Sequence, residues 1–307
     1  MEIILGLTAA VCWGTSDFCA RFASRRIGAY RTLMLMQIFG GAVLTLYLWR
    51  TGEWTHLAAF GLRPWIFAIV GSLINAAASL ALFHAFEIGT MSVAAPVSSA
   101  YPAVTVTLSF MSGERLSAIH GAGVAVIFVG VILAALTLSP QAEPAVAPGS
   151  TKAMESSKGT APSESAQTRL VRGAGWAILA ALGFGVMFWW FGFHVVRDIG
   201  GAASVWVARL TSFFALLFAA VPLRRDISLP RGNVWWLLAV VGLVDTAAFV
   251  ANNVGMQLGH VSIVSVLSSL YGAVTVLLGA IFVREPLRKT QWCGIVLIFA
   301  GIVFVNL

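Results

Sequence analysis

The stretch 87–133 is repeated near the C-terminus, and this internal duplication limits the possible folds more than any other feature of the sequence. Between positions 89 and 108, ten of the twenty residues recur 170 positions further along the chain. The match then resumes at an offset of 171, beginning with Glu114 and Glu285. Shared apolar composition would produce a few such matches by chance, but not the same Ser-Ser-x-Tyr followed by the same Glu-x-Leu. The chain is therefore expected to consist of two structurally related halves.

Composition indicates that the solvent of this chain is a lipid bilayer. Of the 307 residues, 59% are hydrophobic and only 10% are charged, and the mean hydropathy is +0.90. A soluble domain carries about 25% charged residues, so this chain is too poor in charge to cover its own surface in water. A transmembrane helix requires about 20 mostly apolar residues. Ten runs qualify, at approximately 3–20, 32–49, 64–85, 91–111, 118–138, 174–195, 203–222, 233–256, 261–283 and 290–306.

The duplication divides these ten runs into two sets of five. Residues 1–138 hold the first set and residues 172–307 hold the second. The segment 139–171 is rich in Pro, Ala, Ser, Glu and Lys, and we predict a flexible linker because it cannot bury enough apolar surface to become ordered. Since five is odd, the second half must enter the membrane in the opposite sense. We therefore expect an all-α membrane protein with ten transmembrane helices as two inverted five-helix repeats, a common construction of secondary transporters.

Several function classes find no support in the sequence. Cys12, Cys19 and Cys293 all lie in apolar runs, and their odd number and spacing argue against disulfides and against a zinc site. The net charge of +7 is carried by short Arg clusters between the runs, which we interpret as topology signals and contacts with lipid headgroups. The sequence contains no phosphate-binding loop or nucleophile elbow. We expect no metal, no cofactor, no nucleic-acid partner and no enzymatic activity.

Several short motifs stand in the same order as in a known family of membrane carriers. They accompany the two five-span repeats and are Gly-Glu-Arg-Leu at 113–116, Arg-Glu-Pro-Leu at 284–287, Trp-Gly-Thr-Ser-Asp-Phe at 13–18, and Arg209 in the seventh run. In this order they resemble the EamA-type members of the drug/metabolite transporter superfamily. The resemblance implies a ten-helix secondary carrier, often an exporter of amino acids or other small metabolites, with both termini in the cytoplasm. The Lys and Arg residues outside the linker, ten on one side against four on the other, favour the opposite topology.

Charged residues within the apolar runs are candidates for a transport site, because each costs about 2.5–3.5 kcal/mol to insert into a membrane. Asp245 lies near the middle of the eighth run, and Asn252 is two helical turns further on, on the same face. Asp245 could bind a proton or a substrate ammonium group, or it could form a structural pair with a neighbouring helix. Arg209 is its obvious partner, and it could instead bind a substrate carboxylate.

Other polar residues extend this candidate site into the first half of the chain. Asp17 lies toward the far end of the first run and one turn before Arg21, with which it could form a modest ion pair at the membrane interface. Trp13, on the same face, could hold a cationic or aromatic group beside the carboxylate. Asn75 and Ser79 are one turn apart in the third run. In this family many relatives have Asn where this chain has Asp17, which suggests a different substrate or coupling ion.

The repeated Ser-Ser-x-Tyr places one tyrosine at equivalent positions of the two halves. Tyr101 and Tyr271 are site candidates, because a buried phenol needs a hydrogen-bond partner. The serines around them are more typical of close helix packing than of direct binding. Pro102 and Gly272 each follow the tyrosine and should loosen the helix there, as a moving gate would require.

These features predict a secondary transporter that moves a small polar metabolite, an amino acid or similar compound, by alternating access. Without a nucleotide-binding domain the driving force must be an ion or substrate gradient, so we expect proton-coupled or facilitative efflux. Alternatives are an uptake carrier for a sugar or related solute, an intramembrane lipid-handling enzyme, and a non-transporting receptor. The expected setting is the bacterial cytoplasmic membrane, with lipid, a small-molecule substrate and protons as partners of a monomer or homodimer. The predicted site consists of Trp13, Asp17, Asn75, Tyr101, Arg209, Asp245, Asn252 and Tyr271.

Overall fold

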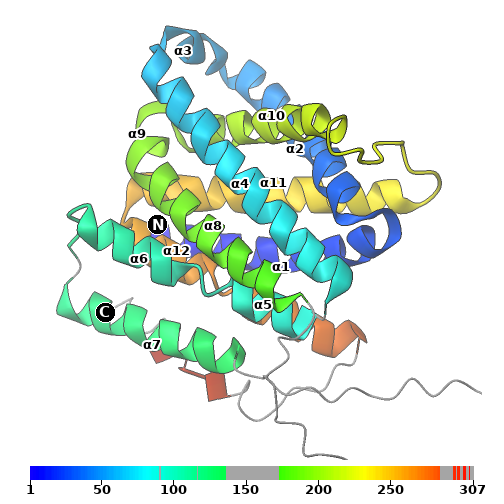
Figure 1. Ribbon diagram of the computed structural model, residues 1–307. Helices are drawn as coiled ribbons and strands as arrows, with labels where there is room; N and C mark the ends of the chain where they lie inside the picture. Colours follow the sequence, from blue (N-terminus) through cyan, green and yellow to red (C-terminus); the bar gives the residue numbers. More distant parts are fainter. Residues whose placement is uncertain are drawn as a thin grey trace, which may run out of the picture.

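The structure, a computed structural model, describes residues 1–89, 91–115, 117–135 and 173–283, and single residues between 293 and 304. Every regular element in these ranges is helical, and the helices cross one another in one bundle (Figure 1). The predicted linker and most of the predicted tenth run lie outside the described residues. The elements are α1 (Glu2–Ile27), α2 (Ala29–Thr51), α3 (Trp54–Ala59), α4 (Leu62–Ile88), α5 (Met91–Ser98), α6 (Pro102–Met111), α7 (Ala118–Ala135), α8 (Ala174–His194), α9 (Val196–Ile199), α10 (Gly201–Ala220), α11 (Val234–Leu258), α12 (Val261–Ser268), α13 (Tyr271–Leu278) and the π-helix η1 (Gly279–Val283).

Most of these helices are suited to a lipid environment. In the described ranges, eight helical segments are long and apolar enough to cross a membrane, and they coincide with the predicted runs one to four and six to nine. α7 lies where the fifth run is predicted. Large apolar side chains are exposed on the outward faces of the bundle, among them Ile4, Leu46, Trp49, Leu62 and Phe218. In a bilayer such side chains face lipid, as expected for an integral membrane protein.

α1 is longer than the apolar run that predicts it. The run was expected to end near residue 20, but the helix continues to Ile27. Gly28 then ends it with a φ of 87°, a left-handed conformation that glycine adopts at little cost. As a result, Asp17 lies well before the end of α1 and inside the bundle.

The fourth and ninth runs are each broken by a short turn. The turn between α5 and α6 covers 99–101, and the turn between α12 and α13 covers 269–270. Within them, backbone N–H groups bond to carbonyl oxygens three residues back, as from Tyr101 to Ser98 (3.3 Å) and from Leu270 to Leu267 (3.2 Å). This is the tightened geometry of a 3₁₀ turn. Both breaks therefore lie beside the positions at which Pro102 and Gly272 predict a loosened helix.

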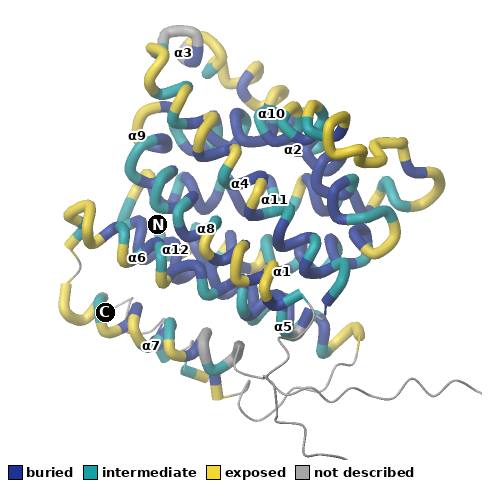
Figure 2. The backbone as a smooth tube through the Cα atoms, viewed as in Figure 1, coloured by how far each residue is buried: buried dark blue, intermediate teal, exposed yellow. Residues whose placement is uncertain are grey.

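Packing contacts of one half are repeated in the other. Gly14 of α1 packs against α13, and Gly185 of α8 packs against α6; at each position an added Cβ would lie 2.5 Å from a valine side chain. Thr275 donates a hydrogen bond to the Gly14 carbonyl (3.2 Å), and Thr105 donates one to the Gly185 carbonyl (2.9 Å). The first helix of each half thus packs against the broken run of the other half, and the halves interlock. Buried residues are concentrated where these helices cross (Figure 2).

The second helix of each half begins on a cap supplied by the third. At the start of α2, the Ala29 N–H donates to Glu87 Oε2 at the end of α4 (3.1 Å). At the start of α10, the Gly201 N–H donates to Gln257 Oε1 at the end of α11 (3.1 Å). These bonds satisfy N–H groups that have no partner within their own helix. The two halves therefore use the same geometry with a carboxylate in one and an amide in the other.

The contact at Gly185 leads to a prediction about stability. We expect Gly185→Ala to destabilise the protein by about 1–3 kcal/mol, because the added methyl group would overpack against Val104 and the Tyr101 carbonyl oxygen. The measurement is the thermal unfolding midpoint of the purified protein in detergent. Gly175→Ala in the same helix is the matched control, since an added Cβ there has no atom within 4 Å. Equal midpoints for the two variants would contradict the interlocked packing.

Candidate functional site

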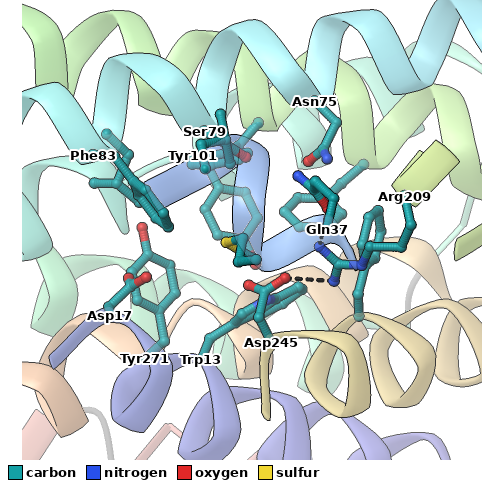
Figure 3. A pocket seen from close by; sticks show the side chains of 16 residues that line it. Trp13, Asp17, Gln37, Asn75, Ser79, Phe83, Tyr101, Arg209, Asp245 and Tyr271 are labelled. Carbon is teal, nitrogen blue, oxygen red and sulfur yellow. Dashed lines mark hydrogen bonds and ion pairs between the residues drawn. The ribbon is translucent and has the colours of Figure 1, made fainter. Parts of the chain in front are cut away.

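A cavity lies at the centre of the bundle, between α1, α2, α4, α8, α10, α11 and the two broken runs (Figure 3). The empty space between its lining atoms amounts to about 540 Å³, which includes the part that opens outward. Within it, about 40 Å³ is wide enough to hold the centre of a water molecule. This is room for a few water molecules, so a solute the size of an amino acid requires the walls to move apart. The lining residues are Trp13, Asp17, Leu33, Met36, Gln37, Asn75, Ser79, Leu82, Phe83, Tyr101, Phe184, Phe188, Arg209, Asp245, Phe249 and Tyr271.

Arg209 of α10 is held by polar groups from two other helices. Its guanidinium group donates to Asp245 Oδ2 of α11 at 2.5 Å and to Gln37 Oε1 of α2 at 3.0 Å. The Arg209 side chain is 3% exposed and that of Asp245 is 17% exposed. The guanidinium carbon also lies 5.7 Å from the ring centre of Phe249, within the range of a cation–π interaction. The cation is therefore neutralised inside the protein, and it connects three helices.

The absence of a side chain at Gly40 allows this arrangement. An added Cβ at Gly40 would lie 2.1 Å from Thr246 Oγ1 and 3.1 Å from Arg209 Nε. α2 can thus approach α10 and α11 closely enough for Gln37 to reach the guanidinium group. The Nε atom points at this helix surface and has no hydrogen-bond partner in the described part of the chain.

Asp17 of α1 lies in the same cavity but in different surroundings. The residue is 4% exposed. Neither a hydrogen bond nor an ion pair joins its carboxylate to any residue that the structure describes. Figure 3 shows Asp17 at one end of the cavity and the Arg209–Asp245 pair toward the other. The cavity therefore contains one carboxylate that is paired with an arginine and one that has no partner among the described residues.

Aromatic rings form a continuous wall between these two ends. The ring centre of Trp13 lies 5.4 Å from that of Phe188, 6.2 Å from that of Phe249 and 6.5 Å from that of Tyr271. Aromatic pairs at these separations interact favourably beyond the area that they bury. The wall presents ring faces and edges to any solute that enters.

Tyr101 and Tyr271 lie at the two helix breaks, and each bonds to the opposite half. The Tyr101 hydroxyl donates to the Ser265 carbonyl (2.8 Å) and shares a hydrogen bond with Ser268 Oγ (2.6 Å). The Tyr271 hydroxyl donates to Ser98 Oγ (2.7 Å). Both phenols thus have the partners that burial requires, and the hydroxyl partners, Ser98 and Ser268, are an equivalent pair of the repeat.

Equivalent residues of the two halves touch each other in this cavity. Tyr101 and Tyr271 do so through their rings, whose centres are 6.4 Å apart at an interplanar angle of 15°. Gln37 and Arg209, which occupy equivalent places in the duplicated sequence, do so through a hydrogen bond. Equivalent positions can approach each other only close to the pseudo-two-fold axis that relates the halves. The cavity therefore lies on this axis, where transporters built from repeats bind their substrates.

Comparison with known proteins agrees with this architecture. The sequence pattern of the EamA-like transporter family matches residues 1–136 and 171–307. The chain belongs to this family. An uncharacterised protein of Methanocaldococcus jannaschii is 27% identical over 136 residues, which are 44% of this chain and 96% of that protein. A protein of a Sinorhizobium species that is named an uncharacterised transporter is 28% identical over 113 residues, which are 32% of this chain and 79% of that protein.

A solved crystal structure shares the fold of this EamA-like protein. It superimposes with a TM-score of 0.70 over 99% of this chain and 96% of that chain, at 20% sequence identity. The predicted all-helical membrane fold and the predicted membership of the drug/metabolite transporter superfamily are therefore confirmed. The number of ten transmembrane helices stays a prediction.

Seven of the eight predicted site residues line the cavity of this EamA-like protein, and Asn252 does not. Asn252 shares a face of α11 with Asp245 but lies about 10 Å further along the helix axis. It is fully buried, and neither amide atom has a hydrogen-bond partner in the described residues. A role of Asn252 in the same site as Asp245 stays a prediction.

Two kinds of lining residue cannot be identified from the sequence alone. Gln37 occupies the place in the first half that Arg209 occupies in the second, but its hydrogen bond to Arg209 does not follow from the sequence. The phenylalanines Phe188 and Phe249 carry no mark that separates them from ordinary membrane-facing residues. The sequence does contain one indication for Phe188. It lies 171 positions after Asp17, the same offset that relates Gly14 to Gly185, and is therefore the equivalent of Asp17 in the second half.

Removal of the anion that pairs with Arg209 should destabilise the protein strongly. Asp245→Ala leaves a buried guanidinium group without its carboxylate, at an expected cost of about 3–5 kcal/mol. A lowered thermal unfolding midpoint in detergent would measure it. The double variant Arg209→Met/Asp245→Leu removes both charges and should recover most of the loss. If the loss of stability in the double variant equals the sum of the losses in the two single variants, Arg209 and Asp245 do not stabilise each other.

Proposed function

We propose that this protein is a secondary transporter that moves a small polar metabolite across the bacterial cytoplasmic membrane by alternating access. The observation that carries the proposal is the position of the cavity on the axis between two interlocked halves, with buried charges in its lining. Charged side chains are costly inside a membrane. Their concentration at this place is explained if a polar solute passes through it.

The broken runs supply the parts that move in this proposal. α5, α6, α12 and α13 are short helices joined by turns, and their positions are coupled by the hydrogen bonds of Tyr101 and Tyr271 to the opposite half. A rocking motion of one half against the other would widen the cavity toward one side of the membrane and then toward the other. The small volume of the cavity fits a state in which no wide path connects it to either side of the membrane.

The driving force is an ion or solute gradient in this proposal, and the direction is efflux, either proton-coupled or facilitative. The two cavity carboxylates, Asp17 and Asp245, are the candidate proton-binding groups. Uptake of a sugar or related solute is the second candidate. It is favoured by the amide groups of Gln37 and Asn75, which lie beside aromatic rings as in a site for a neutral polyol.

Counterflow in reconstituted vesicles tests the transporter function. The purified chain is placed in liposomes loaded with one unlabelled solute, and uptake of the same labelled solute is followed. A panel of amino acids, amines, organic acids and sugars covers both candidates. Transient accumulation of at least one charged metabolite supports the proposal, and selective accumulation of a sugar supports the second candidate. Folded protein that shows no counterflow across the whole panel would contradict both.

Filling the cavity should stop transport without unfolding the protein. Ser79 of α4 lines the cavity, whereas Ala77 of the same helix is exposed on its outer face. We expect Ser79→Phe to lower the counterflow rate by roughly tenfold or more, because its ring would occupy the space that the solute needs. Ala77→Phe adds the same ring toward lipid and should leave the rate unchanged. Equal rates for both variants would place the transport path elsewhere.

A further inference from the structure

The two carboxylates of the cavity differ in whether another described residue neutralises their charge. Asp245 lies 2.5 Å from a guanidinium nitrogen of Arg209, so its charge is already neutralised by the protein. Asp17 is buried, and among the described residues it accepts no hydrogen bond and joins no ion pair. A buried carboxylate without a partner is costly. Since no described residue neutralises Asp17, we assign this role to a proton or a cation that arrives through the cavity.

The surroundings of Asp17 suit an organic cation. Trp13 lies one helical turn away on the same face of α1, and its ring contacts those of Phe188 and Tyr271. Figure 3 shows Asp17 and Tyr271 side by side at one end of the cavity. Aromatic faces attract cations within about 6 Å of the ring centre. A carboxylate beside such rings is the expected site for an ammonium group attached to an apolar body.

The cavity offers no comparable site to an anion. Arg209 is the cation among the described lining residues, and it is already bonded to Asp245 and Gln37. A substrate carboxylate would have to displace Asp245 from a buried ion pair. Selection by charge therefore favours a solute whose cationic end is its principal polar group.

Asp17 faces titratable or charged groups from several helices. Asp245 adds a negative charge that Arg209 balances, so the described lining lacks one positive charge when Asp17 is ionised. The polar faces of α2 and α4 present amide and hydroxyl groups, which do not titrate. The titratable and charged groups nearby are Cys12 and Arg21 on α1 itself, Arg209 of α10, Asp245 of α11, Tyr101 before α6 and Tyr271 of α13.

We propose that Asp17 is the place at which a proton is exchanged for an organic ammonium solute, so that the substrates are amines with an apolar, aromatic-sized body. This inference rests on the transporter function proposed above and names its substrate class and coupling residue. In the exchange, the neutral carboxyl group of Asp17 gives its proton to water as the ammonium group arrives. The O–H bond is replaced by an ion pair between carboxylate and ammonium. One positive charge leaves for each that enters.

Binding measurements at several pH values test the exchange. Radiolabelled phenethylamine is bound to the purified full chain in detergent between about pH 5 and pH 8, where the amine stays protonated. Because protons compete for Asp17, the apparent Kd should rise by about tenfold for each unit of falling pH on the acid side of the titration. Phenethyl alcohol, with the same body but no charge, and the anion hydrocinnamate should bind roughly tenfold or more weakly than the amine.

Variants of Asp17 separate its carboxylate from a structural role. Asp17→Asn should weaken phenethylamine binding by roughly tenfold or more and abolish its pH dependence, whereas Asp17→Glu should keep the pH dependence. Asp198→Asn, on the exposed surface of α9, is the control and should bind as the wild type does. Size-exclusion chromatography verifies that each variant is folded. Unchanged affinity and pH dependence in Asp17→Asn, equal binding of the three compounds, or no amine binding to the wild type would overturn the proposal.

The binding assay needs no transport, so the two proposals can fail separately. Counterflow of a metabolite without an amine that persists in Asp17→Asn would keep the transporter function and overturn the assignment of Asp17. Absence of any counterflow in the wild type, with pH-dependent amine binding intact, would overturn the transporter function and keep the amine site.

Discussion

A buried cation in a membrane protein must find its anion within the protein, because neither lipid nor bulk water can neutralise it there. Arg209 meets this requirement through Asp245 of α11, with Gln37 of α2 as a second acceptor. The three helices are consequently held at fixed separations, and Gly40 permits the close approach of α2. The end of the cavity opposite Asp17 is built on this cluster. The site thus depends on one ion pair for both its shape and its charge balance.

Much of the fold could be predicted because apolar runs and repeated motifs are local properties of the sequence. In the part of the chain that the structure describes, eight long helical segments coincide with predicted runs, and the helix breaks lie beside Pro102 and Gly272. Asp245 and Arg209 could be identified as cavity residues for a physical reason. A charge inside a membrane costs so much that it is retained only where a partner or a solute compensates it.

The remainder depends on contacts between helices, which a single sequence does not display. Asn252 lies on the same face of α11 as Asp245. Its position along the helix relative to the cavity depends on where the neighbouring helices cross α11. Gln37 and Phe188 lie in apolar runs. Neither side chain is charged, so its insertion into a membrane does not cost enough to identify it as a site residue. The burial of Asp17 inside the bundle does not follow from the apolar run, because the basic residues after position 20 interrupt the hydropathy of the run but not the helix, which continues to Ile27.

The paired tyrosines have a consequence for the energetics of the alternating access that we propose. If the two halves were identical, exchanging their conformations would interconvert the two open states, which would then have equal free energy. Tyr101 and Tyr271 preserve this equality, since each finds serine acceptors in the opposite half. Asp17, whose equivalent is Phe188, breaks it. Because about 1.4 kcal/mol changes a population ratio tenfold, a few unmatched charges suffice to decide which side of the membrane the empty carrier faces at rest.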